Sequence, residues 1–283
     1  MEFQHRGSFT LVTDMIGGGP FELKPGEWTD DTSMALCLAI SLVERNGFDP
    51  HDQMMRYCKW AEEGYMSSNG YCFDIGMTVS SALDLFKKTG DPNSGSTDPR
   101  SAGNGCIMRL APIPMFFYPD HQAVIKFSGE SSLTTHGAIE CVDSCRLFGS
   151  MIFKALLGYK KEDILFANQF PGGGKETLSN SIQAIADGAY RNKSQDVIDG
   201  SGYVAECLEA ALWCFYGTNS FREAILKAAN LGGDADTTAA VCGQIAGAYY
   251  GEIGIPKEWR HRLVKHDLIV SIAETILKTK VRT

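Results

Sequence analysis

The sequence predicts an all-α protein that folds as one compact domain over residues 1–283. Segments with apolar residues at helical spacing dominate the chain, whereas alternating strand patterns are scarce. No series of strands alternates with helices, so a parallel sheet is not expected. The polar and Gly-rich segments at 94–105 and 169–175 are too short to join separate domains. We interpret both as loops within a single helical domain.

The expected helices follow one another along the chain and stop at residues that commonly end helices. The segment 32–43 is almost wholly apolar or small and stops at Asn46-Gly47. The segment 74–88 has apolar residues at helical spacing and stops at Gly90-Asp91-Pro92. Further helices are expected at 52–63, 132–157 (one or two helices), 178–190, 203–216, 221–229, 237–250 and 267–278.

Composition and charge exclude several classes of function. The formal net charge is −8, and no Lys/Arg-rich run offers a footprint for nucleic acid or anionic lipid. No apolar run reaches the roughly 20 residues that a membrane span needs, and no signal-peptide stretch opens the chain. The nine cysteines form no Cys-x-x-Cys motif. Because such scattered cysteines are typical of free thiols in a reducing compartment, we predict a cytoplasmic protein.

Two short acidic segments each precede a predicted helix. They are Thr29-Asp30-Asp31-Thr32 and Gly232-Gly233-Asp234-Ala235-Asp236-Thr237-Thr238. One Asp is enough to cap a helix, whereas two repel one another and lose hydration. Only Lys24 is cationic between residues 7 and 44, and no Lys or Arg lies between 228 and 256. A divalent cation suits all-oxygen ligands, so two segments with the same layout favour a metal site over simple capping.

Glycines recur at every fourth position of the helix that follows the second acidic segment. Gly243, Gly247 and Gly251 would lie on one face of that helix. Small residues on one face let a neighbouring backbone approach closely. We therefore expect a central, tightly packed helix that fixes the carboxylates at its N-terminus.

Four segments of the chain resemble the ADP-ribosylglycohydrolase family and occur in that family's order. Besides the two acidic segments, they are Gly103-Asn104-Gly105-Cys106-Ile107-Met108-Arg109 and Thr135-His136-Gly137. Together the four segments span residues 29–237, and the first and last are the most specific. The resemblance implies an all-α, orthogonal helical domain with two Mg²⁺ or Mn²⁺ ions as cofactors.

The resemblance also implies roles for individual residues. Asp236 would bridge the two metal ions, and Glu2 matches an acidic residue near the reaction centre of relatives. The implied metal ligands are Thr29, Asp30, Asp31, Asp234, Asp236 and Thr237, and the implied nucleotide-binding residues are Gly103, Asn104, Gly105, Met108 and His136. Relatives carry a Gly-rich helix before the acidic residue, whereas only Met1 precedes Glu2 here. We therefore expect that this helix is missing and that activity depends on how Glu2 is held.

The predicted function is hydrolysis of the glycosidic bond between ADP-ribose and a modified side chain, with arginine as the first candidate, or of a small ADP-ribosyl compound. Its partners would be ADP-ribose or an ADP-ribosylated protein, and Asp30, Asp31 or Glu2 would act as the catalytic acid or base. One alternative is a family member that binds ADP-ribose or a partner without hydrolysis. The other is a haloacid dehalogenase-like phosphatase, because residues 234–238 fit D-x-D-x-T. That chemistry needs Asp234 at the end of a buried strand.

Overall fold

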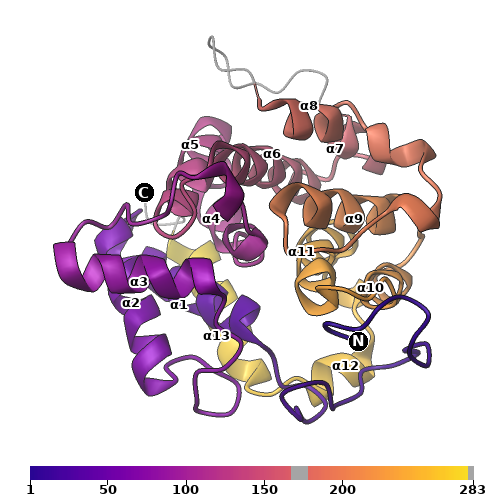
Figure 1. The fold of residues 1–283 in the computed structure, drawn as a ribbon, viewed down its shortest axis with the longest axis horizontal. Helices are drawn as coiled ribbons and strands as arrows, with labels where there is room; N and C mark the ends of the chain where they lie inside the picture. The colour runs from indigo at the N-terminus through magenta and orange to yellow at the C-terminus, as the bar shows by residue number, and fades with distance from the viewer. Residues whose placement is uncertain (167–177, 280–283) are drawn as a thin grey trace.

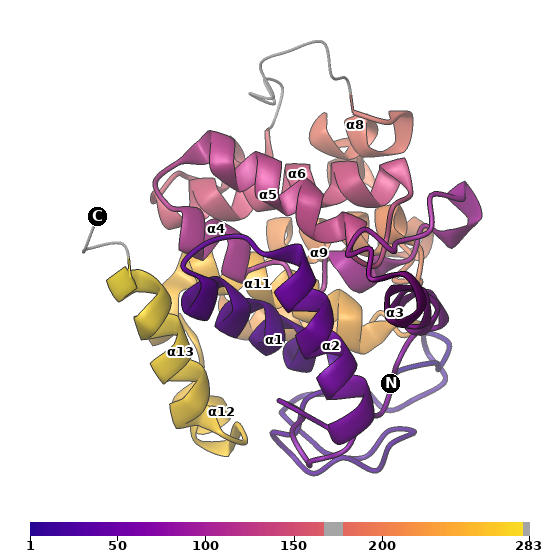
Figure 2. The same cartoon turned by 90° about the vertical axis from the view of Figure 1, so that its left-hand side faces the viewer.

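The computed structural model describes residues 1–166 and 178–279, so the predicted loop at 169–175 lies outside the described residues. Within the described residues the chain forms helices and no β-strand, and only three isolated bridges pair extended residues. In Figure 1 and Figure 2 the helices run in several directions rather than as one parallel bundle. The prediction of an all-α, orthogonal helical fold is confirmed.

The helices of the described residues fall into a long-helix core and shorter connecting pieces. They are α1 Asp30–Arg45, α2 Pro50–Glu63, α3 Met77–Thr89, α4 Pro112–Phe117, α5 His121–Leu133, α6 Ile139–Leu156, α7 Lys161–Leu165, α8 Asn180–Ala186, α9 Val204–Tyr216, α10 Phe221–Ala229, α11 Ala235–Gly254, α12 Lys257–Arg262 and α13 His266–Thr279. None of these helices combines the length and the apolar character that crossing a membrane would require.

Helices α6, α9 and α11 form the centre of the molecule. Helix α11 packs against α9, α10 and α6, while α1 packs against α2 and α13 on the other side. Every residue of α9 from Ala210 to Phe215 is buried, as is the run Leu147–Phe153 of α6. Burial of this apolar surface is the main stabilising contribution to such a fold. The N-termini of α1 and α11 are thereby fixed by well-packed helices.

The first residues of the chain are held by backbone hydrogen bonds to the loop before α11. The amide of Phe3 donates to the carbonyl of Gly233 at 2.7 Å, and the amide of Gly233 donates to the carbonyl of Gln4 at 2.8 Å. The side chain of Arg6 donates to the carbonyls of Leu231 and Ile198. Gly233 has φ +66°, a conformation that favours glycine. Glu2 is therefore held next to the second acidic segment.

Two of the predicted helical segments differ in their bounds from the helices of the structure. Helix α3 begins at Met77, not at 74, and Asp74 has a left-handed φ of 59° outside the helix. The segment 132–157 was predicted as one or two helices. It contains α6, which begins at Ile139, and only the last two residues of α5, a helix over 121–133 that was not predicted. Between them the amide of Gly137 donates to the carbonyl of Ser96 at 2.9 Å. This break places His136 in a fixed loop.

The glycine-lined face of α11 does not receive a backbone, contrary to expectation. A Cβ at Gly243 would lie 3.5 Å from the side chain of Ile225, and one at Gly247 would lie 3.9 Å from that of Phe221. The face therefore receives the apolar side chains of α10. Gly251 has φ +68° and interrupts the helical conformation rather than continuing it. The glycines thus make room for α10 side chains and for a kink near the end of α11.

Candidate active site

Carboxylates from four separate segments meet at the N-termini of α1 and α11. Carboxylate oxygens of Asp30, Asp31 and Asp236 lie within 4.8 Å of one another. Those of Glu2, Asp74 and Asp236 form a second group within the same distance. Asp236 belongs to both groups. The site therefore consists of two adjoining acidic clusters that share one residue.

The carboxylates at these helix termini do not cap their helices. Thr29 is the N-cap residue of α1 and Asp234 is that of α11, yet neither side chain accepts a capping hydrogen bond. Instead, the hydroxyl of Thr29 lies 2.9 Å from Oδ2 of Asp31 and 3.0 Å from Oδ2 of Asp236. This hydroxyl joins the two helix N-termini directly. The capping interpretation of the two acidic segments is therefore not supported, and another role must account for their charges.

Burial and mutual repulsion raise the pKa values of this group. Desolvation, followed by repulsion from neighbouring carboxylates, raises the pKa of Asp236 to about 7 and that of Glu2 to about 8. The same causes, in the same order, raise the pKa of Asp74 to about 6 and place those of Asp30 and Asp31 well above their ordinary range. No Lys or Arg of the described residues lines the adjoining cavity. No Lys or Arg side chain of the described residues therefore neutralises the carboxylates from the side of the cavity.

Two buried carboxylate oxygens of the acidic clusters lack a hydrogen-bond partner, and a bound metal ion would supply one. Oδ1 of Asp31 and Oδ1 of Asp236 are buried and have no hydrogen-bond partner. A buried polar atom without a partner is costly, so such atoms are normally satisfied by a ligand or ion. The available donors are all oxygens, which suits a hard divalent cation such as Mg²⁺ or Mn²⁺. The residues present therefore fit a divalent metal site.

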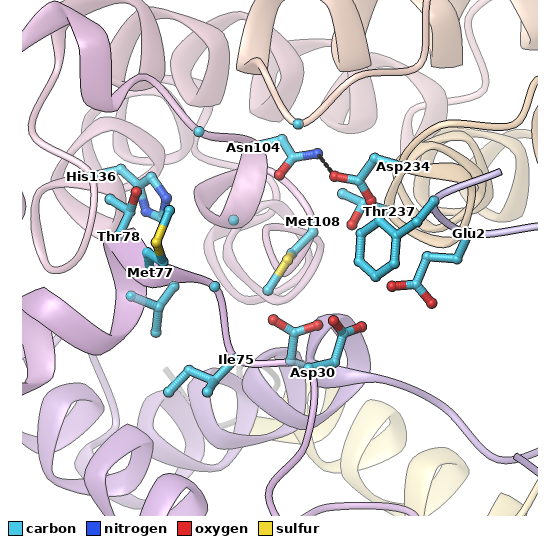
Figure 3. Close-up of a pocket in the computed structure, with 17 residues that line it drawn as sticks. Glu2, Asp30, Ile75, Met77, Thr78, Asn104, Met108, His136, Asp234 and Thr237 are labelled. Carbon is cyan, nitrogen blue, oxygen red and sulfur yellow. Dashed lines mark hydrogen bonds between the residues drawn. The ribbon is translucent and has the colours of Figure 1, made fainter. Parts of the chain in front are cut away.

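A cavity of about 500 Å³ opens beside the acidic clusters. Nine of the residues singled out from the sequence line it, namely Glu2, Asp30, Gly103, Asn104, Gly105, Met108, His136, Asp234 and Thr237. Thr29, Asp31 and Asp236 do not line the cavity and lie in the adjoining cluster. Figure 3 shows Asn104 and Asp234 on one side of the cavity and Asp30 on the other, with His136 at the end away from Glu2. The structure thus brings all of the predicted site residues together.

The loop around Gly103 is fixed to the next segment of the site. Nδ2 of Asn104 donates to Oδ2 of Asp234 at 2.8 Å, and the Asn104 amide donates to the carbonyl of Gly202 at 3.0 Å. A Cβ at Gly105 would lie 2.9 Å from Cε1 of His136, so only glycine fits without a shift. The loop therefore lies directly between the acidic clusters and the imidazole of His136.

Sequence reasoning missed Asp74 and the residues that follow it. Asp74 belongs to one acidic cluster, and the cavity wall continues through Ile75–Val79. The signal was present as an acidic residue followed by Gly76 just before an apolar helix. The helical spacing that continues back to Asp74 concealed it, because that spacing assigned Asp74 to the helix itself.

The haloacid dehalogenase-like alternative is contradicted by the structure. That chemistry requires the first Asp of the motif to follow a buried strand. Asp234 instead follows α10 and a turn, and the described residues contain no strand. The D-x-D-x-T match is therefore accidental in this fold.

The fold and the site define a helical glycohydrolase domain. The chain belongs to the ADP-ribosylglycohydrolase family, whose description it matches over residues 1–283. It is 43% identical over 265 residues to an ADP-ribosylarginine hydrolase of Serratia proteamaculans, which covers 94% of this chain and 71% of the relative. The corresponding protein of Pseudomonas putida is also 43% identical, with 94% and 70% covered.

More distant comparisons agree with this assignment. An ADP-ribosyl-[dinitrogen reductase] glycohydrolase of Rhodospirillum rubrum is 25% identical over 270 residues, covering 93% of this chain and 84% of that protein. A solved structure described as an ADP-ribosylglycohydrolase-related protein complex superposes with a TM-score of 0.85 at 38% identity, covering 98% of this chain and 90% of that one. The family resemblance seen in the sequence is confirmed.

Proposed function

We propose that this protein hydrolyses the N-glycosidic bond between ADP-ribose and an arginine side chain of a modified protein. One observation carries the proposal: buried carboxylates with unpartnered oxygens adjoin a cavity lined by the Gly103–Gly105 loop. The cavity volume of about 500 Å³ lies in the range of small-molecule sites. The name shared by the two relatives at 43% identity favours arginine as the linked residue.

Two divalent cations, Mg²⁺ or Mn²⁺, are the proposed cofactors. Asp236 is the proposed shared ligand, since it belongs to both acidic clusters. The other proposed ligands are Thr29, Asp30, Asp31, Asp234 and Thr237, and Asp74 is added to them because it shares the second cluster with Asp236. When bound, such ions would neutralise the carboxylates, orient the ribose hydroxyls and lower the pKa of the attacking water.

The protein's own groups supply the proposed proton transfers. Glu2 lines the cavity, and burial raises its pKa to about 8 in the metal-free protein. Glu2 is the proposed acid that protonates the leaving nitrogen, while water adds to the anomeric carbon and gives its proton to the base. Asp30 is a better candidate than Asp31 for the base, because Asp30 lines the cavity and Asp31 lies behind it. The backbone pairing of Phe3 with Gly233 holds Glu2 for this role.

The loop and the imidazole are proposed to hold the nucleotide. The Gly103–Gly105 loop is proposed to hold the diphosphate. The amide of Gly103 already donates to the carbonyl of Ser101 at 2.7 Å, so the amide of Gly105 is the proposed donor to a diphosphate oxygen. Met108 lies in the middle of the cavity wall, above Asp30, and His136 extends the wall to the end away from Glu2. All nine cysteines are free thiols, which supports the expectation of a reducing compartment such as the cytoplasm.

The test is release of free ADP-ribose from an arginine-ADP-ribosylated protein with Mg²⁺ or Mn²⁺, and again with EDTA. We expect metal-dependent release, with little release from a serine-ADP-ribosylated protein of equal labelling. ADP-ribose binding without release would instead support a non-catalytic family member. Preference for the serine linkage would overturn the assignment of arginine while leaving the hydrolase intact.

A further inference from the structure

Arg109 is a fully buried guanidinium that forms no ion pair with any acidic side chain of the described residues. It lies 4.7 Å from the ring centre of Tyr57 and donates to the hydroxyls of Thr134 and Thr135 at 3.1 and 2.6 Å. Its Nε atom has no hydrogen-bond partner. Burying such a charge is costly, so a role beyond packing is needed to explain it.

The hydrogen bond from Arg109 to Thr135 bears on the direction of the bond between Thr135 and His136. A guanidinium can only donate, so Oγ1 of Thr135 accepts the bond from Arg109. The hydroxyl hydrogen of Thr135 is then free to point at Nδ1 of His136, which lies 2.8 Å away. The oxygen of Thr135 could accept a second bond, but among the contacts of the described residues Nδ1 is the acceptor within reach of its hydroxyl hydrogen. Nδ1 is therefore assigned as the acceptor, and the neutral imidazole carries its proton on Nε2. Burial lowers the pKa of His136 to about 4. Cys106 opposes this shift and the charge of Arg109 adds to it, so the ring is neutral.

The Nε2 edge of His136 faces the loop that lines the cavity. A Cβ at Gly103 would lie 3.4 Å from Nε2, and one at Gly105 would lie 3.3 Å from the same atom. Figure 3 shows the imidazole at the wall of the cavity beside Thr78. A proton on Nε2 is therefore available at the place where the loop meets the cavity.

We propose that Arg109 and Thr135 are positioning residues that fix His136 as an Nε2–H donor to an oxygen of the ligand bound beside Gly103 and Gly105. The identity of that ligand as ADP-ribose rests on the proposed function. The position of the proton does not, because it follows from contacts within the protein. The two parts can therefore be tested separately.

The position of the proton is tested first, in the ligand-free protein, by NMR of ¹⁵N-labelled histidine side chains. The chain has six histidines, and the signal of His136 is identified by its loss in His136→Gln. We expect an unprotonated Nδ1 and a protonated Nε2 in the wild type. Thr135→Val should weaken or invert this pattern, and Thr135→Ser should retain it. A protonated Nδ1 in the wild type, or an unchanged pattern in Thr135→Val, would overturn the proposal.

Thr134→Val is the matched control. The Thr134 hydroxyl also accepts from Arg109, but it donates to the carbonyl of Ser131 rather than to His136. This variant should lose about as much stability as Thr135→Val does and keep the His136 signal unchanged. Thr135 is varied rather than Arg109, because removing a buried guanidinium threatens the fold. A change of the His136 signal in Thr134→Val as large as in Thr135→Val would refute the specific connection through Thr135.

The second test measures the Kd of ADP-ribose by calorimetry in the presence of Mn²⁺. Loss of an aligned donor should raise Kd about tenfold in Thr135→Val, with Thr135→Ser and Thr134→Val close to wild type. An unchanged Kd in a Thr135→Val protein that has lost the proton pattern would overturn the ligand contact. A wild type that does not bind ADP-ribose would refute the proposed function instead, and the NMR result would still decide whether Thr135 positions the ring.

Discussion

Replacing Asp236 with Asn should stabilise the metal-free protein and abolish its stabilisation by metal. Desolvation and the nearby Asp234 raise the pKa of Asp236 from 3.8 to about 7. The folded state therefore binds this proton more tightly than the unfolded chain, so the stability it contributes is present at low pH and is lost as pH rises through about 7. That pKa difference corresponds to about 4 kcal/mol, which we reduce to about 2 kcal/mol because the side chain is partly exposed.

The assay is thermal unfolding followed by circular dichroism in EDTA at pH 5 and pH 8. Asn keeps an oxygen that can accept from Thr29 but has no charge. At pH 8 the variant should melt about 4 °C above wild type, and the difference should shrink at pH 5. With Mn²⁺ at about 100 times its Kd, wild type should gain about 2.7 kcal/mol, whereas the variant should gain little.

Asp267→Asn is the matched control, because this carboxylate is fully exposed in the first turn of α13. It should change neither the pH dependence nor the metal response. The reasoning would be refuted if Asp236→Asn melted below wild type in EDTA at pH 8. It would also be refuted if the variant gained as much stability from Mn²⁺ as wild type does.

Three further substitutions test the loop and the core. Asn104→Asp places a second carboxylate where Nδ2 now donates to Asp234 at 2.8 Å, so the Kd of ADP-ribose should rise at least about tenfold, and unchanged binding by calorimetry would contradict the role of this contact. Gly105→Ala puts a Cβ 2.9 Å from His136, so it should weaken ADP-ribose binding while leaving Mn²⁺ stabilisation intact; parallel loss of both would indicate a general collapse of the site. Lys161→Met removes donors to the carbonyl of Phe215 in the last turn of α9, at 2.8 Å, and to that of Thr218 just after it, at 2.7 Å, so urea unfolding should show a loss of about 2 kcal/mol, and wild-type stability would exclude this capping role.

Local sequence determined most of the helices and their ends. The segment predicted at 221–229 coincides with α10, and the predicted stop after 32–43 is realised by Asn46 in the left-handed conformation at the end of α1. Such signals are readable because they depend on the spacing of apolar side chains and on the backbone preferences of single residues. The short helices α4, α7 and α12 were not predicted, since five or six residues carry too little periodicity to be recognised.

The sequence also identified the acidic segments, because two carboxylates without a nearby cation are unusual at the start of an apolar helix. It could not show that Thr29 joins the two helix N-termini, or that Asp74 and Glu2 complete a second cluster around Asp236. Those contacts bring together residues more than 200 positions apart, as with Thr29 and Asp236. Only the packing of α1 against its neighbours and of α11 against α9 and α10 places these side chains within reach.

For His136, too, the sequence determined one part of the site and the tertiary structure another. Its sequence context indicated a residue beside a nucleotide only through a family resemblance. Its burial, its bond to Thr135 and the buried Arg109 behind it were decided by tertiary structure. The physical reason is that local sequence sets backbone preference and side-chain chemistry, whereas desolvation and hydrogen-bond direction depend on every group that packs around a side chain.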